Sequence, residues 1–525
     1  MRTCRWNFTA PPGRAHALGP RRRAHALGWA ALAMATAGLV LVPAEARAQS
    51  VDRPRIMQEP GEITDVIDAF DDDNGDPYDF SFRLEFQYLA KQARILRETS
   101  AFAPGLTTGG FTSKLLNVGD YTETTSKLTP RADFGIYKDL ALYFKVPIIL
   151  SNSRKIEEAS SDVGGTSALA LEGAPGEQLF SLPFESPDRS GVEYLGIGID
   201  YAIFNQARDR TKPTWVFGVE TRISVGTPMH ACQKGASPEC AHPGDVNRNG
   251  GFDDSVVSPD DPSIELESRE ADDERSPGVT RGTVGLELHT MMSKRLKYIE
   301  PYGGFRMLAE FAMGNSDFGA TDLEGALVNH PPIIGTVFIG MMVHPWENRE
   351  SYNRLTFDVG FQGEYHSEGR DYGELFDAIG SSAAPSLRNP MWSRYSGQNC
   401  SVQSCVDLSS EKVYNTGLTV VEPYGSYRLH GGVTWRAHEY VKFNSGLGLR
   451  FDQAHGISHD QPCNPDLQDD LGASGPCNSN LGNNQFQATG VPNPAYRRTI
   501  NSIGRRFYVD NSITYEVFAS GTVMF

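Results

Sequence analysis

The most constraining feature of this sequence is a two-residue alternation of apolar and polar side chains that recurs along the chain. The clearest stretches are 80–88, 195–203, 215–225 and 357–365. A period of two places the apolar side chains on one face of a strand. Hydrophobic residues make up only 39% of the chain and the longest apolar run lies near the N-terminus, which excludes a polytopic helical membrane protein. The sequence therefore predicts an all-β fold.

Extending this pattern predicts twelve strands. A soluble β-sandwich would produce the same alternation, with the apolar face turned inward, so the strands alone do not decide between a sandwich and a barrel. The predicted strands cover about 80–97, 122–137, 140–150, 191–204, 213–226, 279–293, 297–311, 331–345, 353–367, 417–436, 440–452 and 507–525.

The connections between these strands alternate strictly in length. Those after even-numbered strands are short: 138–139, 205–212, 294–296, 346–352 and 437–439. Those after odd-numbered strands are long: 98–121, 151–190, 227–278, 312–330, 368–416 and 453–506. This is typical of a transmembrane antiparallel up-and-down β-barrel of the outer membrane, with short periplasmic turns and long extracellular loops. We therefore predict one barrel over 80–525, and ten or fourteen strands if 98–121 or 368–416 is read differently.

Aromatic residues and the C-terminus agree with a barrel in a membrane. Residues beside the short turns form the aromatic belt expected at a membrane–water interface: Trp215, Tyr298, Trp346, Trp435 and Tyr440. The last strand alternates apolar residues and ends at Phe525. Over 513–525 it resembles the C-terminal signal of Gram-negative outer-membrane barrel proteins. The resemblance implies that the barrel-assembly machinery reads Phe525 and that the barrel lies in outer-membrane lipid.

Two segments precede the predicted barrel. Residues 1–48 have an arginine-rich start, an uncharged stretch from Ala24 to Ala44 and the sequence Ala46-Arg47-Ala48, which predicts a cleaved secretory signal peptide. A membrane-anchoring helix is the alternative, and Pro43 and Glu45 disfavour it. Residues 49–79 hold ten acidic residues against two arginines, with a short amphipathic helix expected over 62–70. We expect this periplasmic segment to enter the lumen, dock another envelope protein or serve as a flexible lead-in.

The cysteines point to an oxidising compartment. Without the leader, six remain, and all fall in three of the long loops: Cys232, Cys240, Cys400, Cys405, Cys463 and Cys477. Pairing within each near-neighbour pair gives three disulfides that staple the loops. A thiolate zinc site is the alternative, although no C-x-x-C spacing supports it.

The polar faces of the strands predict a charged lumen. The residues expected to line it are Arg83, Glu85, Arg131, Asp133, Lys145, Glu220, Arg222, Glu287, Glu300, Arg306, Glu310, Arg428, Lys442 and Arg450. Such a set either fills the interior with ion pairs or borders a narrow selective pore. Because eight strands are filled by side chains and sixteen leave a wide channel, twelve predict a narrow lumen.

Two further motifs suggest a metal site and an enzyme. The 245–254 stretch holds the D-x-N-x-N-G pattern of a calcium loop, so Asp245, Asn247, Asn249 and Asp253 are predicted calcium ligands, without the Glu that would complete an EF-hand. The 365–370 stretch resembles the His-x-Ser-Asn-Gly-Arg sequence of outer-membrane phospholipase A. Here His366 and Ser367 are adjacent, so on a strand they point to opposite faces, and no omptin-like acid pairs stand out.

These features favour a non-enzymatic protein. The first hypothesis is a narrow, porin-like channel for small polar solutes. The alternative is a surface anchor or the outer-membrane part of an envelope complex, because the long loops hold about half of the mature chain; a rim hydrolase is the third. The net charge of −17 argues against nucleic acid as a partner, and calcium is the one cofactor expected.

Overall fold

The computed structural model describes Thr64, Val66 and most of residues 80–525. The gaps after residue 80 are 103–110, 160–170, 175, 207, 236–238, 241–256, 259–260, 266–275, 314–316, 320–327, 349–350, 389–414, 439, 465–477, 481–485, 489–490 and 494. The chain divides into two compact units, Met1–Asp52 and Arg53–Phe525, and every described residue belongs to the second. Among these residues, no helix is long and apolar enough to cross a membrane.

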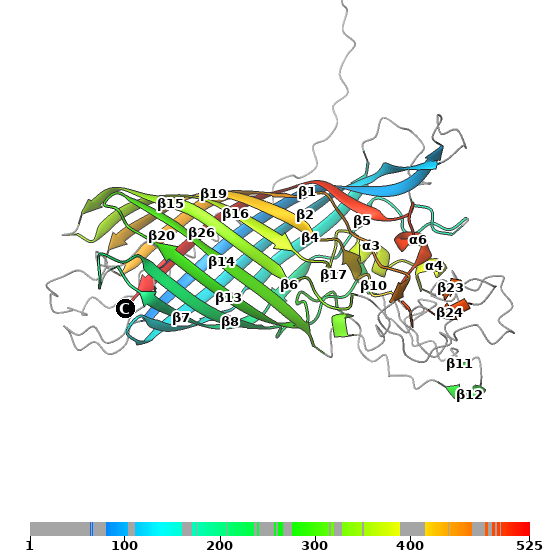
Figure 1. Ribbon diagram of the computed structural model, residues 1–525, viewed down its shortest axis with the longest axis horizontal. Coiled ribbons are helices and arrows are strands. Elements are labelled where there is room, and N and C mark those ends of the chain that lie inside the picture. Colours follow the sequence, from blue (N-terminus) through cyan, green and yellow to red (C-terminus); the bar gives the residue numbers. More distant parts are fainter. Residues whose placement is uncertain are drawn as a thin grey trace, which may run out of the picture. The chain divides into compact units, whose positions relative to one another are not determined.

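Twelve antiparallel strands close into one barrel, because β1 pairs with β2 on one side and with β26 on the other (Figure 1). This confirms the predicted fold. In order around the barrel the strands are β1 (Phe80–Phe102), β2 (Phe111–Tyr137), β3 (Leu140–Lys145), β7 (Leu195–Phe204), β8 (Thr214–Ile223), β13 (Thr283–Ser293), β14 (Ile299–Ala312), β15 (Ile334–Asn348), β16 (Asn353–His366), β19 (Tyr424–His438), β20 (Val441–Asp452) and β26 (Phe507–Met524).

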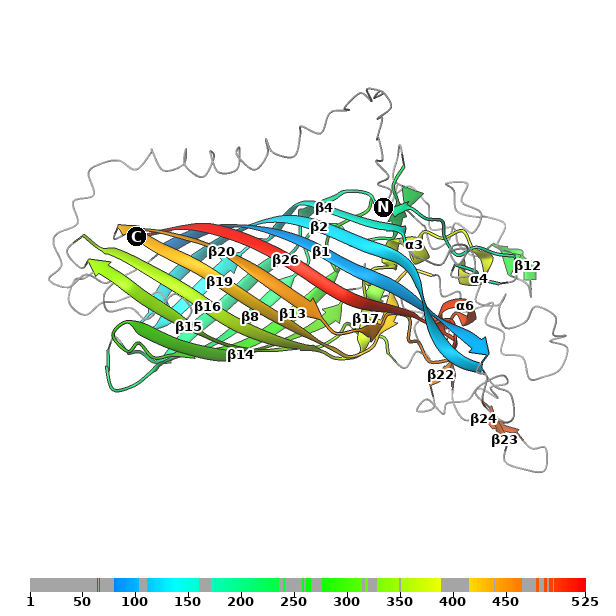
Figure 2. The same ribbon diagram turned by 90° about the horizontal axis from the view of Figure 1, so that it is seen from above.

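Short turns gather at one end of the barrel and long connections at the other (Figure 2). The turn between β2 and β3 is only Lys138 and Asp139, and Asp139 adopts the left-handed conformation (φ 58°) that so tight a reversal requires. The C-terminus also lies at the turn end. There the N–H of Phe525 donates to the carbonyl of Phe80 at 2.8 Å, and the N–H of Phe80 donates back at 3.2 Å.

Several strand ends differ from the prediction, two of them at prolines. The predicted 140–150 strand is split into β3 and β4 (Ile148–Glu158) at Pro147, which has no N–H for the ladder. The predicted 417–436 strand enters the barrel only at Tyr424, after Pro423. Its first part, β18 (Thr419–Val421), pairs instead with β17 (Gly369–Asp371).

Two other strand limits also shift. The predicted 191–204 strand is divided into β6 (Arg189–Val192) and β7. The expected 98–121 loop is mostly strand, because β1 and β2 stay paired as far as Phe102 and Phe111. The hairpin therefore lengthens two existing strands and adds none to the barrel.

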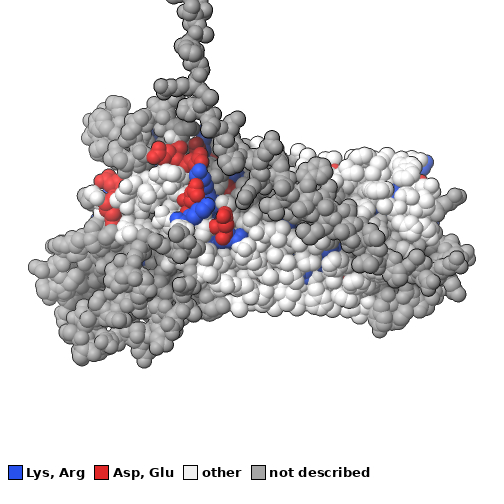
Figure 3. Space-filling view, turned by 180° about the vertical axis from the view of Figure 1, so that it is seen from behind, with Lys and Arg blue, Asp and Glu red and all other residues white. Residues whose placement is uncertain are grey.

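The barrel wall is apolar outside and polar inside, the reverse of a soluble core. Large apolar side chains are exposed along the outer face, including Leu447 (64% exposed), Val359 (59%) and Ile339 (59%). Charged side chains on other barrel strands, such as Glu220 on β8 and Glu300 on β14, are almost completely buried inside. In Figure 3 the visible wall carries few charges, and most of those described gather near the loop end.

The main apolar core lies at the loop end. Leu179, Ile379 and Leu387 from the loops pack with Ile95 and Phe507 from the wall. Short helices take part: α3 (Phe376–Gly380), α4 (Pro385–Arg388) and α6 (Arg498–Asn501). We call the described loop segments that build this end the loop cap: 171–174, 176–187, 228–235, 367–388, 415–423, 453–462 and 495–506.

Candidate functional site in the barrel lumen

Two cavities lie inside the barrel. The loop-side cavity has a volume of about 640 Å³ and reaches Lys91, Tyr424 and Asp452. The turn-side cavity has a volume of about 360 Å³ and reaches Ser81 and Met524, where β1 begins and β26 ends. Both are lined mainly by polar and charged side chains. A molecule held in either cavity would therefore meet hydrogen-bonding groups rather than an apolar surface.

Eleven of the fourteen residues predicted to line the lumen border one or both cavities: Arg83, Glu85, Arg131, Asp133, Lys145, Glu220, Glu287, Arg306, Arg428, Lys442 and Arg450. The other three lie on the inner face without bordering either cavity. Arg222 contacts Glu220 and Glu287, Glu300 is fully buried at the turn end, and Glu310 pairs with Arg281 at the loop end.

Ion pairs cover one wall of the turn-side cavity. Glu220 accepts from Lys145 and from Arg222, each at 2.7 Å. On the neighbouring strands Arg131 contacts Asp133 at 2.6 Å and Asp200 at 3.4 Å. Because each acid has a basic neighbour, this wall carries little uncompensated charge.

Gly218 makes room for one pair on that wall. The Asp200 carboxylate lies 2.7 Å from Nε2 of His289, and the two side chains meet directly over Gly218. A Cβ added at Gly218 would lie 2.1 Å from the His289 ring and 2.2 Å from the Asp200 carboxylate. We therefore attribute the glycine to this close approach.

Similar pairs line part of the loop-side cavity. Glu516 accepts two hydrogen bonds from Arg428, at 2.6 and 2.9 Å, and Asp452 accepts from Arg450 at 3.0 Å. The ammonium of Lys91 bonds Glu374 of the loop cap at 2.8 Å. Burial opposes ionisation of Glu374, but Lys91 more than compensates and holds the pKa of Glu374 below its usual value.

Five residues border both cavities: Arg83, Arg306, Gln362, Arg428 and Lys442. We call this set the waist. It contains four cations, one amide and no acid, and of these cations Arg428 is paired with Glu516. β1, which carries Arg83, and β14, which carries Arg306, are six strand-to-strand steps apart in either direction around the barrel. The two arginines therefore face one another across the lumen.

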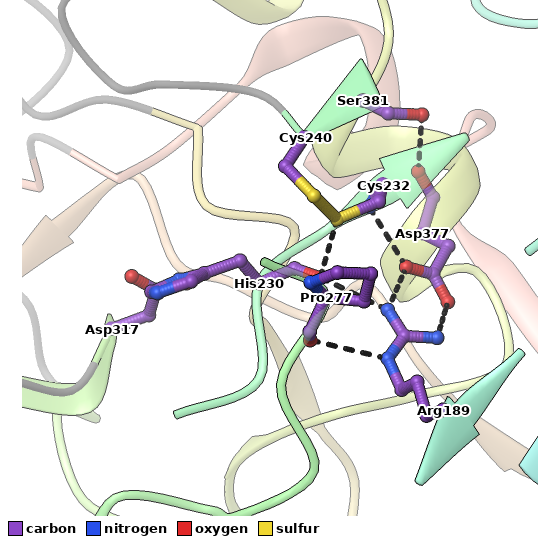
Figure 4. Close-up of a disulfide and its surroundings, with 8 residues drawn as sticks. All are labelled: Arg189, His230, Cys232, Cys240, Pro277, Asp317, Asp377 and Ser381. Carbon is purple, nitrogen blue, oxygen red and sulfur yellow. Dashed lines mark hydrogen bonds and ion pairs between the residues drawn. A yellow bond between two sulfur atoms is a disulfide. The ribbon is translucent and has the colours of Figure 1, made fainter. Parts of the chain in front are cut away.

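The loop cap is fastened by buried polar contacts, some of which Figure 4 shows. Arg189 donates to both carboxylate oxygens of Asp377, at 3.0 and 2.6 Å, and both side chains are almost completely buried. The same guanidinium donates to the carbonyls of His230 and Pro277. Asp377 also accepts from the N–H of Cys232, which forms a disulfide with Cys240. One carboxylate thus joins three distant loop segments.

At the turn end a hydrogen-bonded chain closes the inner wall. Glu300 accepts from Ser293 at 2.7 Å and lies 3.3 Å from His344, whose other ring nitrogen is 2.9 Å from Thr356. The hydroxyl of Thr64 adds a 2.7 Å bond to Ser293. Part of the N-terminal segment therefore contacts the inner wall. Thr64 and Val66, the described residues of the expected 62–70 helix, are not helical.

The lipase-like motif does not assemble a catalytic pair. His366 lies 3.6 Å from Glu364 and stacks on the ring of Tyr424. Ser367 accepts from the N–H of Ile333 and donates to the carbonyl of Glu368. The two side chains therefore make different local contacts, and Ser367 lies just beyond the end of β16.

Other predicted sites lie partly or wholly outside the described residues. The calcium ligands Asp245, Asn247, Asn249 and Asp253 are among these, as are Cys400, Cys405 and Cys477, and the side chain of Cys463 is not described either. Within the described part of the chain, no group of three His, Cys, Asp or Glu residues could hold a metal ion. Of the expected disulfides, the structure contains Cys232–Cys240.

Sequence reasoning missed several lumen residues. Lys91, Glu123 and Glu516 border the loop-side cavity but were not among the predicted lining residues. Lys91 continues the odd-numbered series of Arg83 and Glu85 along β1, so strict alternation would have found it. No sequence pattern indicated Arg189 and Asp377, because they are 188 residues apart and neither belongs to a recognisable motif.

No protein family and no curated protein matches this sequence. Solved structures that it resembles include an outer membrane channel from Pseudomonas putida F1, at 9% identity and a TM-score of 0.31, covering 84% of this chain and 95% of that one. A Pseudomonas aeruginosa FadL homologue matches at 8% identity and a TM-score of 0.31, over 84% and 90% of the two chains. The outer membrane protease OmpT from Escherichia coli matches at 7% identity and a TM-score of 0.23, over 85% and 97%.

Proposed function

We propose that this chain is an outer-membrane barrel that lets small polar solutes pass through its lumen. The observation that carries the proposal is the pair of polar cavities, about 640 and 360 Å³, that share the waist residues inside a closed wall. Solutes of a few polar atoms fit such spaces and find replacement hydrogen bonds for the water they shed. The lumen is too densely lined for a wide, unselective pore.

The outside of the barrel supports a membrane location. Apolar side chains cover the wall, and Trp215, Tyr298, Trp346 and Trp435 are exposed beside the turns, as expected for an aromatic belt at an interface. Phe525 is 57% exposed at the turn end and its ring stacks on that of Phe80. We propose that the assembly machinery reads this exposed C-terminal residue.

The test is recording from the mature protein in planar lipid bilayers. Discrete conductance steps in potassium chloride are expected, smaller than those of a wide porin because the lumen is narrow. Protein that has not folded is recognised by the absence of heat-modifiable migration on gels. Folded, inserted protein that gives no steps would overturn the channel proposal.

The loop cap favours a second candidate, a binding or structural role at the cell surface. The observation that supports this role is the apolar core that contains Leu179, Ile379 and Leu387. Because of this core, the cap is a packed unit rather than a set of separate loops. A pull-down with cross-linked whole cells tests it. Recovery of the same envelope protein from wild-type cells, and its loss when Asp377 is replaced by Ala, would support this role. Absence of any reproducible partner would rule it out.

A further inference from the structure

The waist arginines stand out because two of them lack the partners that the other basic groups in the lumen have. Among the described residues, neither Arg83 nor Arg306 forms an ion pair or a hydrogen bond. Arg306 lies over the ring of Phe338, 5.2 Å from its centre. The Nε atom of Arg83 is buried and has no acceptor. By contrast, Arg131, Lys145 and Arg428 each contact a carboxylate.

Arg306 is exposed and Arg83 is half-buried, and both border the two cavities. Their guanidinium groups therefore keep N–H donors that a solute in the lumen can use. Carboxylates and phosphates present several oxygens in a geometry that matches the donors of arginine. Acids that border the cavities have other partners. Glu287, which interacts electrostatically with Arg306, already contacts Arg222. Glu516 is held by Arg428 and Gln87, and Glu85 borders only the loop-side cavity.

Basic residues continue from the waist toward the turn end. Strand register places Arg83 opposite Thr522, Thr522 opposite Lys442, and Lys442 opposite Arg436, which in turn faces Arg354. Directly opposed residues lie on the same face of a sheet, so this row follows the inner wall. Arg354 is the second residue of β16. Strand tilt makes the row descend the barrel as it crosses from strand to strand.

We propose that the waist binds small oxyanions, of the carboxylate or phosphate type, between Arg83 and Arg306, and that it makes the lumen selective for anions. The selectivity rests on the proposed channel function, whereas the binding site does not. Gln362 adds an amide whose nitrogen also donates to Glu364. Lys442 adds positive charge from β20, whereas the charge of Arg428 on β19 is balanced by Glu516. A chain of net charge −17 thus presents cationic side chains where its two lumen cavities share lining residues.

Two variants test the site: the double substitution Arg83→Gln/Arg306→Gln and, as a matched control, Arg94→Gln. Arg94 lies on the same strand β1 but is exposed. All proteins must show heat-modifiable migration before use. Calorimetric titration of the detergent-solubilised protein uses inorganic phosphate in one arm and succinate in the other. We expect binding to weaken about tenfold for each arginine lost and to be unchanged in Arg94→Gln.

Binding in one arm alone identifies the preferred oxyanion class. Wild-type protein that binds neither anion, or a double variant that binds as well as wild type, would overturn the proposal. The second readout is the reversal potential across a potassium chloride gradient, which should indicate anion preference in wild type and lose most of it in the double variant. Cation preference in wild type would overturn the selectivity and leave the channel standing. Arginine-dependent binding without any conductance would keep the anion site and reject the channel.

Discussion

The barrel wall and the loop cap are held together by opposite means. Each wall strand is hydrogen-bonded to a neighbour on both sides, and the wall buries charged side chains inside while exposing Leu447 and Ile339. The cap has a conventional apolar core around Ile379 and depends on a few long-range contacts such as Arg189–Asp377. The comparison suggests that damage to one region spares the other, since their stabilising interactions are different in kind.

The largest expected effect is on the cap. Replacing Asp377 by Ala leaves the buried Arg189 without its carboxylate, and breaking a buried pair in this way costs about 3–5 kcal/mol. Limited proteolysis should then cut the cap while the heat-modifiable barrel remains. Asp188→Ala is the control, because Asp188 is an exposed acid beside Arg189. Equal protease resistance in both variants would show that the cap does not depend on this pair.

The wall should respond to a charge on its outer face. Replacing Ile339 by Lys places an ammonium near the middle of β15 where lipid is expected, and this costs about 2–4 kcal/mol. The same change at Ile503, which is 81% exposed in the cap, should alter stability by less than about 0.5 kcal/mol. Urea unfolding in lipid vesicles measures both. Equal costs at the two positions would remove the distinction between wall and cap.

Reduction of Cys232–Cys240 should act on the cap alone. The bond closes a segment with a sequence separation of 8, which on a chain-entropy argument is worth roughly 2–3 kcal/mol. We expect dithiothreitol to expose the 228–240 region to protease without changing the heat-modifiable band. Loss of that band on reduction would mean that the wall also depends on the disulfide.

Calcium removal is expected to have the smallest effect. A site of modest affinity formed by Asp245, Asn247, Asn249 and Asp253 would stabilise its loop by about 1–3 kcal/mol in millimolar calcium. A chelator should therefore speed cleavage within 227–278, and Asn247→Ala should cleave at the same rate with or without calcium. Cleavage of wild type that ignores the chelator would eliminate the calcium site.

The wall could be predicted because its physics is local and repetitive. Alternation alone identifies all twelve strands, and the parity of Arg83 and Glu85 places both on the inner face. Two of the predicted strands were too long because the hydropathy pattern continues through Pro147 and Pro423. Proline has no N–H to donate, so the observed strands are interrupted at these residues. The cap could not be predicted in the same way. Arg189 meets Asp377 only after the intervening strands have formed, and no local pattern records such a contact.

The waist lies between these two cases. Alternation placed Arg83, Arg306, Arg428 and Lys442 on the lumen side, but it could not show which of them would find acids. Arg428 meets Glu516 because β19 lies two strands from β26 in the closed barrel. Arg83 and Arg306 are directly opposed because the barrel has twelve strands, six steps in each direction between β1 and β14. With ten or fourteen, the same two sequence positions would be offset from direct opposition.

The pairing of β1 with β26 has a consequence for the order of assembly. The first and last strands are neighbours, so closure waits until the final residues of the chain are in place. Until then the polar edge of β1 has no partner from its own sheet, and lipid cannot satisfy it. A truncated chain is therefore not a slightly smaller barrel. Removing β26 leaves unpaired edges on both β1 and β20, and the wall is then an open sheet rather than a closed barrel.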